Sequence, residues 1–247
     1  MKTSGNTILV TGGGSGIGRE LARKWHDLGN TVIVAGRTQR SLDETATGRE
    51  NMHTMTVDVG DVGDTDRFAR EVVKAYPALN VLVNNAGIMR FEDVTAARDL
   101  GDAEATVATN LLGPIRLIDG LIEHLKAQDD AAIVNVTSGL AFVPMPRTAT
   151  YSATKAALHS YTISLRAKLA GQVEIIEIAP PAVQTELTPG QSTREGYMPL
   201  DQFIEETMRG FIAEDTPSEV LTENVLFLRN AEAEGRFDKA LAVTSQF

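Results

Sequence analysis

The sequence predicts an α/β protein in which helices cover both faces of a doubly wound parallel sheet. Three observations support this fold class. Short apolar runs rich in Val and Ile alternate with longer amphipathic segments, a pattern typical of right-handed βαβ units. A glycine-rich turn directly follows the first apolar run. The 247 residues contain no Pro/Ser linker, repeat or low-complexity tract, so one domain, residues 1–247, is expected.

Six apolar runs have the length and residue types of buried strands. They are rich in β-branched residues and are bounded by residues that favour turns. In chain order these runs span residues 7–11, 31–36, 51–58, 79–87, 131–138 and 173–180. The ALAVT run at 240–244 is either a short last strand or a packed extension. A sheet of six or seven strands is therefore expected.

The segments between these runs carry apolar residues at helical spacing. In the first segment Ile17, Leu21 and Trp25 recur on one face, and Gly29 ends the helix. Helices are expected at residues 17–29, 38–47, 63–76, 98–108, 109–127, 149–170, 199–213 and 217–229. The tail after Arg229 is ambiguous.

Composition excludes several classes of function. The absence of Cys removes disulfide scaffolds, thiolate metal sites and cysteine nucleophiles, and the four His are not at metal-ligand spacing, so no metal is expected. A net charge of −10 disfavours nucleic-acid binding. No apolar run approaches the ~18 residues of a membrane span, and the N-terminus does not resemble a signal peptide. A cytoplasmic protein that binds neither membrane nor nucleic acid is expected.

The glycine-rich turn TGGGSGIG, residues 11–18, joins the first strand to the first helix. Glycines there permit a tight turn and close backbone approach to a pyrophosphate, and the helix N-terminus supplies N–H donors. This context favours a Rossmann-like dinucleotide site over a glycine turn without a ligand. The expected cofactor contacts in this turn are Thr11, Gly12, Gly14, Ser15, Gly16, Ile17 and Gly18.

Tyr151 and Lys155 are four residues apart on a predicted helix, so they share one face. Hydride transfer to a carbonyl leaves an oxygen that needs a proton and hydrogen-bond donors. A phenol with a pKa near ~10 is a poor acid or base at neutral pH, but a nearby ammonium favours the phenolate. We expect Tyr151 to carry the proton, Lys155 to lower its pKa, and Ser138 to hold the substrate oxygen. Alone, the Tyr–Lys pair would be typical of a solvated surface.

These motifs together resemble the single-domain branch of the short-chain dehydrogenase/reductase superfamily. The shared residues, in the family's order across 7–185, are Gly12, Gly16, Gly18, Asp58, Asn84–Gly87, Asn110, Ser138, Tyr151 and Lys155. The APPAVQT and SGLAFVP stretches resemble a bacterial subgroup of poorly characterised oxidoreductases. The resemblance implies hydride transfer between a nicotinamide cofactor and a carbonyl or secondary alcohol, in a homodimer or homotetramer.

The resemblance also implies roles for single residues. Lys155 would hydrogen-bond the nicotinamide ribose. Asn110 would mark a distorted helix and anchor a water that relays protons from Lys155. A distortion there is expected independently, because Pro114 follows closely and a proline within a helix frees carbonyls upstream. Without the family match, Asn110 would be an ordinary polar helix residue.

The end of the second strand predicts the cofactor preference. NAD enzymes place an acidic residue about 20 residues after the glycine loop, whereas this chain has Gly36 followed by Arg37 and Thr38. No carboxylate repels a 2′-phosphate, and Arg37 is suited to grip one, so NADP(H) is preferred over NAD(H). Further cofactor contacts implied by the resemblance are Asp58, Val59, Asn84, Ala86, Gly87, Tyr151, Lys155, Pro180, Val183 and Thr185. Pro181 replaces the family's usual glycine, which stiffens this loop.

The substrate side is expected to be mainly apolar, under a loop or lid at about residues 185–214. Its candidate residues are Ser138, Leu140, Phe142, Tyr151 and Leu187. A small apolar ketone, aldehyde or alcohol fits this composition. One alternative is an enoyl-type reductase, although that group spaces Tyr and Lys more widely. The other is a catalytically weak NADP(H)-sensing or scaffold protein, although such proteins tend to lose the Tyr or Lys.

Overall fold

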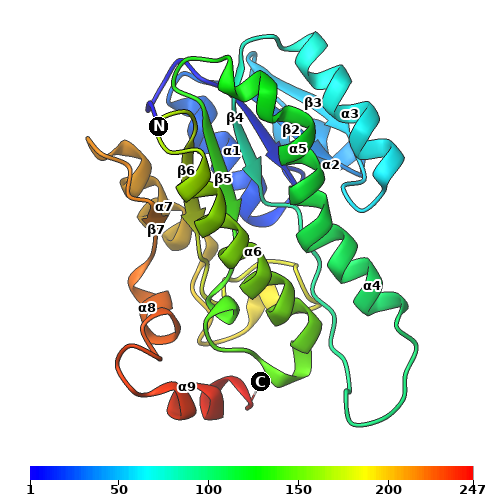
Figure 1. Ribbon diagram of the computed structural model, residues 1–247, viewed down its shortest axis with the longest axis vertical. Coiled ribbons are helices and arrows are strands. Elements are labelled where there is room, and N and C mark those ends of the chain that lie inside the picture. The colour runs from blue at the N-terminus through cyan, green and yellow to red at the C-terminus, as the bar shows by residue number, and fades with distance from the viewer. Residues whose placement is uncertain (247) are drawn as a thin grey trace.

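The computed structural model describes residues 1–246. Its sheet contains seven parallel strands in the order β3-β2-β1-β4-β5-β6-β7, and helices lie on both faces (Figure 1). The strands are β1 Thr7–Thr11, β2 Thr31–Gly36, β3 Met52–Thr56, β4 Leu79–Asn84, β5 Ala132–Val136, β6 Glu174–Ile178 and β7 Glu219–Val220. The predicted single α/β domain with a doubly wound parallel sheet is confirmed.

Helices connect the strands as the sequence periodicity predicts. They are α1 Gly16–Asp27, α2 Gln39–Ala46, α3 Val62–Ala75, α4 Gly101–Val107, α5 Gly113–Lys126, α6 Ala149–Lys168, α7 Leu200–Ile212, α8 Glu223–Arg229 and α9 Phe237–Thr244. A π-helical turn, Ala108–Leu112, joins α4 to α5. This turn confirms the expected distortion upstream of Pro114.

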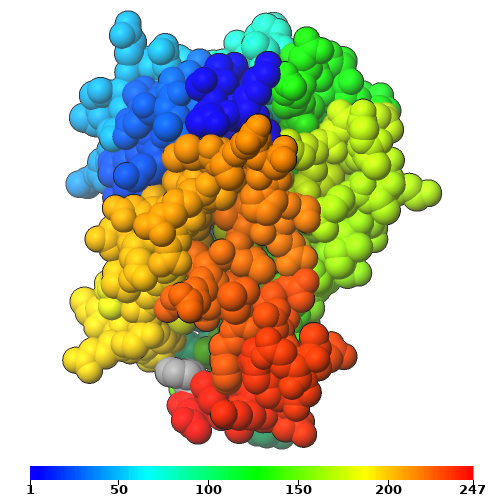
Figure 2. All heavy atoms as spheres, turned by 90° about the vertical axis from the view of Figure 1, so that its left-hand side faces the viewer, coloured from blue at the N-terminus to red at the C-terminus, as the bar shows by residue number. Residues whose placement is uncertain are grey.

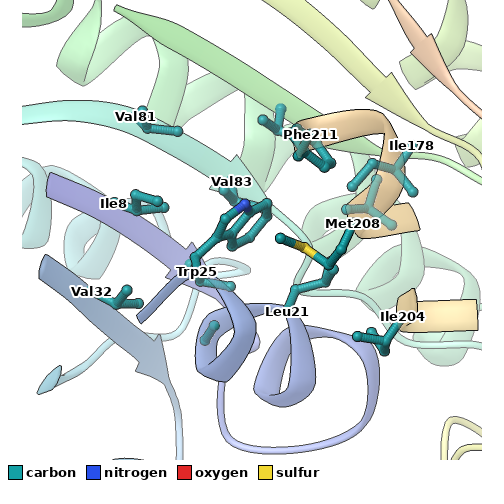
Figure 3. Packing of buried hydrophobic residues seen from close by; sticks show 14 of the residues in the cluster. Ile8, Leu21, Trp25, Val32, Val81, Val83, Ile178, Ile204, Met208 and Phe211 are labelled. Atoms are coloured by element: carbon teal, nitrogen blue, oxygen red, sulfur yellow. The ribbon is translucent and has the colours of Figure 1, made fainter. Parts of the chain in front are cut away.

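Two hydrophobic layers hold the helices to the sheet. Buried residues of α1, α2 and α7 pack on one face, and those of α3 and α5 pack on the other. In the first layer Trp25 of α1 meets Phe211 of α7 edge-on, with ring centroids 5.3 Å apart (Figure 3). The apolar stripe of α7, which includes Ile204 and Met208, belongs to this core. The part of the expected lid formed by α7 is thus packed on the sheet.

The C-terminal quarter differs from the prediction in two places. The expected helix 217–229 begins only at Glu223, because Glu219 and Val220 pair with β6 as the seventh strand. The ALAVT run lies in α9 and not in a strand. Its buried residues Ala240 and Thr244 are one helical turn apart, and the Thr244 hydroxyl donates to the carbonyl of Pro144 (2.7 Å). The run is therefore a helical extension packed on the domain. Figure 2 shows α7 and this C-terminal segment, orange to red, on one side of the molecule.

The strand order reverses between β1 and β4, so their carboxyl ends diverge into a crevice where such sheets bind ligands. The glycine turn follows β1 at this edge, and Ser138 follows β5. Across residues 1–246, no helix is both long and apolar enough to traverse a bilayer. The same residues contain no cluster of three or more His, Asp or Glu arranged to hold a metal ion.

Candidate active site

A cleft of about 440 Å³ opens at the carboxyl edge of the sheet. It brings together most of the residues singled out from the sequence. Those that line it are Gly12, Gly14, Ser15, Gly16, Ile17, Gly18, Arg37, Thr38, Asp58, Val59, Ala86, Gly87, Ser138, Tyr151, Lys155, Pro180, Val183, Thr185 and Leu187. One continuous cavity therefore joins the glycine turn, the end of β2 and the Tyr–Lys pair.

Five of the other candidate residues, Thr11, Asn84, Asn110, Leu140 and Phe142, lie outside the cleft lining and have other contacts. Thr11 is buried, and its hydroxyl accepts hydrogen bonds from the backbone N–H groups of Asn85 (3.0 Å) and Ala86 (3.1 Å). Asn84 is also buried, and its amide donates to Asn135 on β5 (2.9 Å). These two residues hold neighbouring strands together behind the cleft and do not line it.

The substrate candidates Leu140 and Phe142 also lie outside the cleft lining. The backbone N–H of Leu140 donates to the Ser138 hydroxyl (3.1 Å), so this residue contributes through its backbone. The ring of Phe142 lies between the Arg229 guanidinium, 4.7 Å from its centroid, and the His159 ring, at 4.8 Å. The turn Gly139–Ala141 directs Phe142 toward α8, which apolar character alone did not reveal.

The cleft is also lined by residues that were not predicted as site residues, among them Asn85, Gln191 and Arg90. Asn85 donates through its side-chain amide to the carbonyl of Thr11 (2.9 Å) and so holds the glycine turn. Its place in the Asn-Asn-Ala-Gly motif was the available signal. Gln191 donates to the carbonyl of Val183 (2.8 Å), and Arg90 lines the cleft beside Tyr151. No local pattern distinguishes these last two.

The glycine turn forms a cradle that other residues would fill. Gly12 and Gly16 have φ values of +66° and +52°, in the left-handed region that favours glycine. A Cβ on Gly14 would lie 2.5 Å from the Ser41 hydroxyl, and one on Gly18 would lie 2.3 Å from the Asn85 amide nitrogen. The bare backbone at the start of α1 therefore fits the close approach of a pyrophosphate.

We expect Gly18→Ala to destabilise the fold by about 1–3 kcal/mol and to weaken dinucleotide binding. The added methyl would clash with the Asn85 amide and with the carbonyl of Gly12, so both would have to move away from the turn. Urea unfolding and cofactor titration measure the two effects. Gly63→Ala in α3 is the matched control, since its Cβ would meet only Asp61 Oδ1 at an ordinary 3.5 Å. Parental unfolding and parental affinity in Gly18→Ala would contradict the close-packed cradle.

The end of β2 has no acidic side chain toward the cleft. Gly36, Arg37 and Thr38 line this part of the cavity, and Arg37 is exposed. A Cβ built on Gly36 would meet only Leu42, at 3.6 Å. Space for a carboxylate therefore exists at this position, but the sequence leaves it empty.

Tyr151 and Lys155 project from α6 toward the end of β5. The Lys155 ammonium donates to the carbonyl of Val136 (2.8 Å) and lies 5.7 Å from the centroid of the Tyr151 ring. The Tyr151 side chain forms a hydrogen bond with that of Ser138. Three of the four predicted catalytic residues thus meet at one end of the cleft.

Burial controls the proton affinity of this pair. It raises the pKa of Tyr151 to about 12, against the opposing effect of the Ser138 hydrogen bond. Burial lowers the pKa of Lys155 to about 8, against the opposing charge of Glu177. The expected lowering of the Tyr151 pKa by Lys155 is outweighed by desolvation in this arrangement, where the ammonium donates to the carbonyl of Val136.

Asn110 lies fully buried in the π-helical turn. Its side chain accepts a hydrogen bond from the backbone N–H of Ile88 (2.9 Å) and donates to the carbonyl of Ile88 (2.8 Å). It also donates to the Thr154 hydroxyl (3.3 Å). Asn110 therefore connects the loop after β4 to α6 near Lys155, one step behind the cleft surface.

The fold and this arrangement define a class of protein, the nicotinamide-dependent oxidoreductases with a Rossmann-like fold. Residues 6–196 match the model of the short chain dehydrogenase family. The chain is 40% identical over 235 residues to an uncharacterized oxidoreductase, DltE, of Bacillus subtilis, covering 94% of this chain and 93% of that protein. The protein belongs to the short-chain dehydrogenase family.

Solved structures show the same fold. A Burkholderia cenocepacia short chain dehydrogenase in complex with NADP is 25% identical, with a TM-score of 0.82 over 98% of this chain and 99% of that one. A Brucella melitensis 3-ketoacyl-(acyl-carrier-protein) reductase complexed with NADH is 23% identical, with a TM-score of 0.79 over 91% and 100%. Structural neighbours thus bind either cofactor.

Proposed function

We propose that this protein transfers a hydride between NADP(H) and the carbonyl or secondary alcohol of a small molecule. The observation that carries the proposal is the single cleft that joins the glycine cradle to Ser138, Tyr151 and Lys155. A bound nicotinamide supplies the hydride. The buried phenol and the adjacent hydroxyl supply the proton and the hydrogen bond that a carbonyl oxygen needs when it becomes an alcohol.

Each residue has a distinct part in this proposal. Ser138 holds the substrate oxygen, and Tyr151 gives it a proton in reduction and removes one in oxidation. Lys155 supports Tyr151 through its charge and binds the nicotinamide ribose. Asn110 donates a hydrogen bond to Thr154, the residue before Lys155 on α6, and it anchors the water that returns a proton to Tyr151 through Lys155.

The proposed preference for NADP(H) rests on the end of β2. Gly36 presents no carboxylate, and the exposed guanidinium of Arg37 is available on the cleft wall for a 2′-phosphate. Asp58 and Val59 line the adjacent wall, where we place the adenine. Pro180, Val183 and Thr185 line the opposite end, where we place the carboxamide.

We propose a small, largely apolar substrate beneath residues 185–199, with Leu187 facing it. Gln191 bonds to Val183 and to Thr185 (3.3 Å), so this segment is tied to the cleft wall. Arg90 and Glu186 add charged side chains to the cleft lining.

We further propose that the protein is cytoplasmic and forms a homodimer or homotetramer through α5 and α6. Two large apolar side chains are exposed there, Leu112 just before α5 and Ile163 on α6. Analytical ultracentrifugation tests this assembly.

Fluorescence titration with NADPH and NADH, followed by a panel of ketones, aldehydes and secondary alcohols, tests the proposed function. We expect saturable NADPH binding and turnover of carbonyl substrates. NADPH binding without turnover of any panel member would favour the cofactor-sensing alternative. Reduction of an α,β-unsaturated carbonyl at its C=C bond would favour the enoyl-type alternative.

A further inference from the structure

A cluster of charged side chains lies behind the cleft, between α6, α8 and the last two strands. At its centre is Glu177 of β6, whose side chain is fully buried. The Thr137 hydroxyl donates to this carboxylate (2.6 Å), and the Nδ1 of His159 lies 2.8 Å from it. Neither Glu177 nor His159 lines the cleft, so the proposed reaction assigns no direct contact to them.

A second carboxylate stands beside the first. Glu219 of β7 is the register partner of Glu177, so both side chains extend from the same face of the sheet. Arg229 of α8 binds Glu219 through two hydrogen bonds of 2.8 and 3.0 Å. The hydrogen bonds from Arg229 hold the pKa of the Glu219 carboxyl below its usual range, and interactions with His159 and Arg166 lower it further.

Stability alone does not account for a buried carboxylate at this place. Moving a charge out of water is costly, and replacing a buried ion pair with well-packed apolar residues is commonly neutral or stabilising. Ile175, two residues before Glu177 and therefore on the same face of β6, is a buried apolar residue of the core layer on that face. The charge therefore points to a role in the adjacent site.

Glu177 connects to both sides of the catalytic pair. Thr137 lies between Val136, whose carbonyl accepts the hydrogen bond from Lys155, and Ser138. On the other side, His159 lies one helical turn beyond Lys155 on α6. The negative charge of Glu177 also opposes the lowering of the Lys155 pKa by burial.

We propose that Glu177 is a positioning residue for the reaction assigned above. It fixes the end of β5 against α6 through Thr137 and His159, and its charge keeps Lys155 protonated. The titratable and charged groups around Glu177 are His159, which contacts it, its register partner Glu219, and Lys155 and Arg229, whose charges interact with it. The proposal rests on the proposed function, because it assigns Lys155 and Ser138 to catalysis.

Two variants separate these contributions. Glu177→Gln removes the charge but keeps an oxygen that accepts from Thr137, whereas Thr137→Val keeps the charge and removes the bond. The protonation of Lys155 is measured by NMR of protein labelled with ¹³C at the lysine ε-carbon, with its signal assigned by its loss in Lys155→Arg. Glu174→Gln, on the same strand but exposed and paired with the N-terminal ammonium, is the control for loss of a paired carboxylate away from the site.

We expect Glu177→Gln to move the titration midpoint of Lys155 to lower pH, and the alkaline limb of kcat/KM to follow it. Thr137→Val is expected to leave the midpoint in place and to lower kcat about tenfold, because Ser138 loses its support. An unchanged midpoint in Glu177→Gln, or a parental kcat in Thr137→Val, would overturn the proposal. The NMR titration needs no turnover, so it tests the charge of Glu177 even if the protein reduces no carbonyl. If Glu177→Gln does not fold, the kcat of Thr137→Val still tests the positioning of Ser138.

Discussion

Tyr151→Phe is expected to lower kcat for carbonyl reduction by about 10²–10⁴-fold, the range that general acid catalysis supplies. The ring still fills its space beside Lys155, so the dissociation constant of NADPH should remain close to the parental value. Steady-state kinetics and fluorescence titration measure the two quantities. Tyr76→Phe is the control, because this partly buried tyrosine ends α3 outside the cleft lining.

The pH dependence gives the same prediction a second readout. With a pKa of about 12, Tyr151 keeps its proton throughout the neutral range, so reduction should not weaken as pH falls toward 6. Alcohol oxidation needs the phenolate and should rise with pH. Because the pKa of Lys155 is about 8, its ammonium is lost above that pH, and reduction should decline there. A Tyr151→Phe variant with parental kcat and the parental pH profile would show that the phenol does not carry the proton.

The double variant Gly36→Asp with Arg37→Gln is expected to invert the cofactor preference. Loss of a charge-assisted contact to the 2′-phosphate costs about 1.5–3 kcal/mol, roughly ten- to a hundredfold in kcat/KM for NADPH. The new carboxylate repels that phosphate and is suited to accept from the ribose hydroxyls of NADH. The site has room for it, since a Cβ at Gly36 meets only Leu42 at 3.6 Å.

Kinetics with both cofactors for parent and variant measure this inversion. Arg70→Gln, which removes an exposed arginine of α3 outside the cleft lining, is the control for the loss of one arginine charge away from the cofactor site. Equal kcat/KM for NADPH and NADH in the parental protein would contradict the assignment of Arg37 to the 2′-phosphate.

Much of the fold was predictable because local signals coincide with the tertiary structure. The β-branched runs predicted the six longer strands, and the glycine turn predicted where the cleft begins. The seventh strand was not predictable: Glu219 and Val220 form only two residues of ladder, and their pairing depends on β6 and on the ion pair with Arg229. ALAVT has strand-like composition, but contacts distant in sequence select a helix.

The site shows the same division between local and tertiary information. Ser138, Tyr151 and Lys155 were found by spacing, and the structure brings them together at one end of the cleft. Asn84, and not Asn85, was predicted to contact the cofactor, because a sequence motif does not show which way a side chain points. In the structure the Asn84 amide donates to Asn135 on the neighbouring strand and does not line the cleft. The pKa of Tyr151 depends on burial, which the sequence does not quantify.

We propose that hydride passes between NADP(H) and a carbonyl carbon with Tyr151 as the proton carrier. The most direct test is mass spectrometry of the product formed with NADPH deuterated at the transferring position of the nicotinamide, in parent and Tyr151→Phe. We expect an alcohol with deuterium on the carbinol carbon, formed at a strongly reduced rate in Tyr151→Phe. Deuterium on a carbon β to an intact carbonyl, or no labelled product despite saturable NADPH binding, would contradict it.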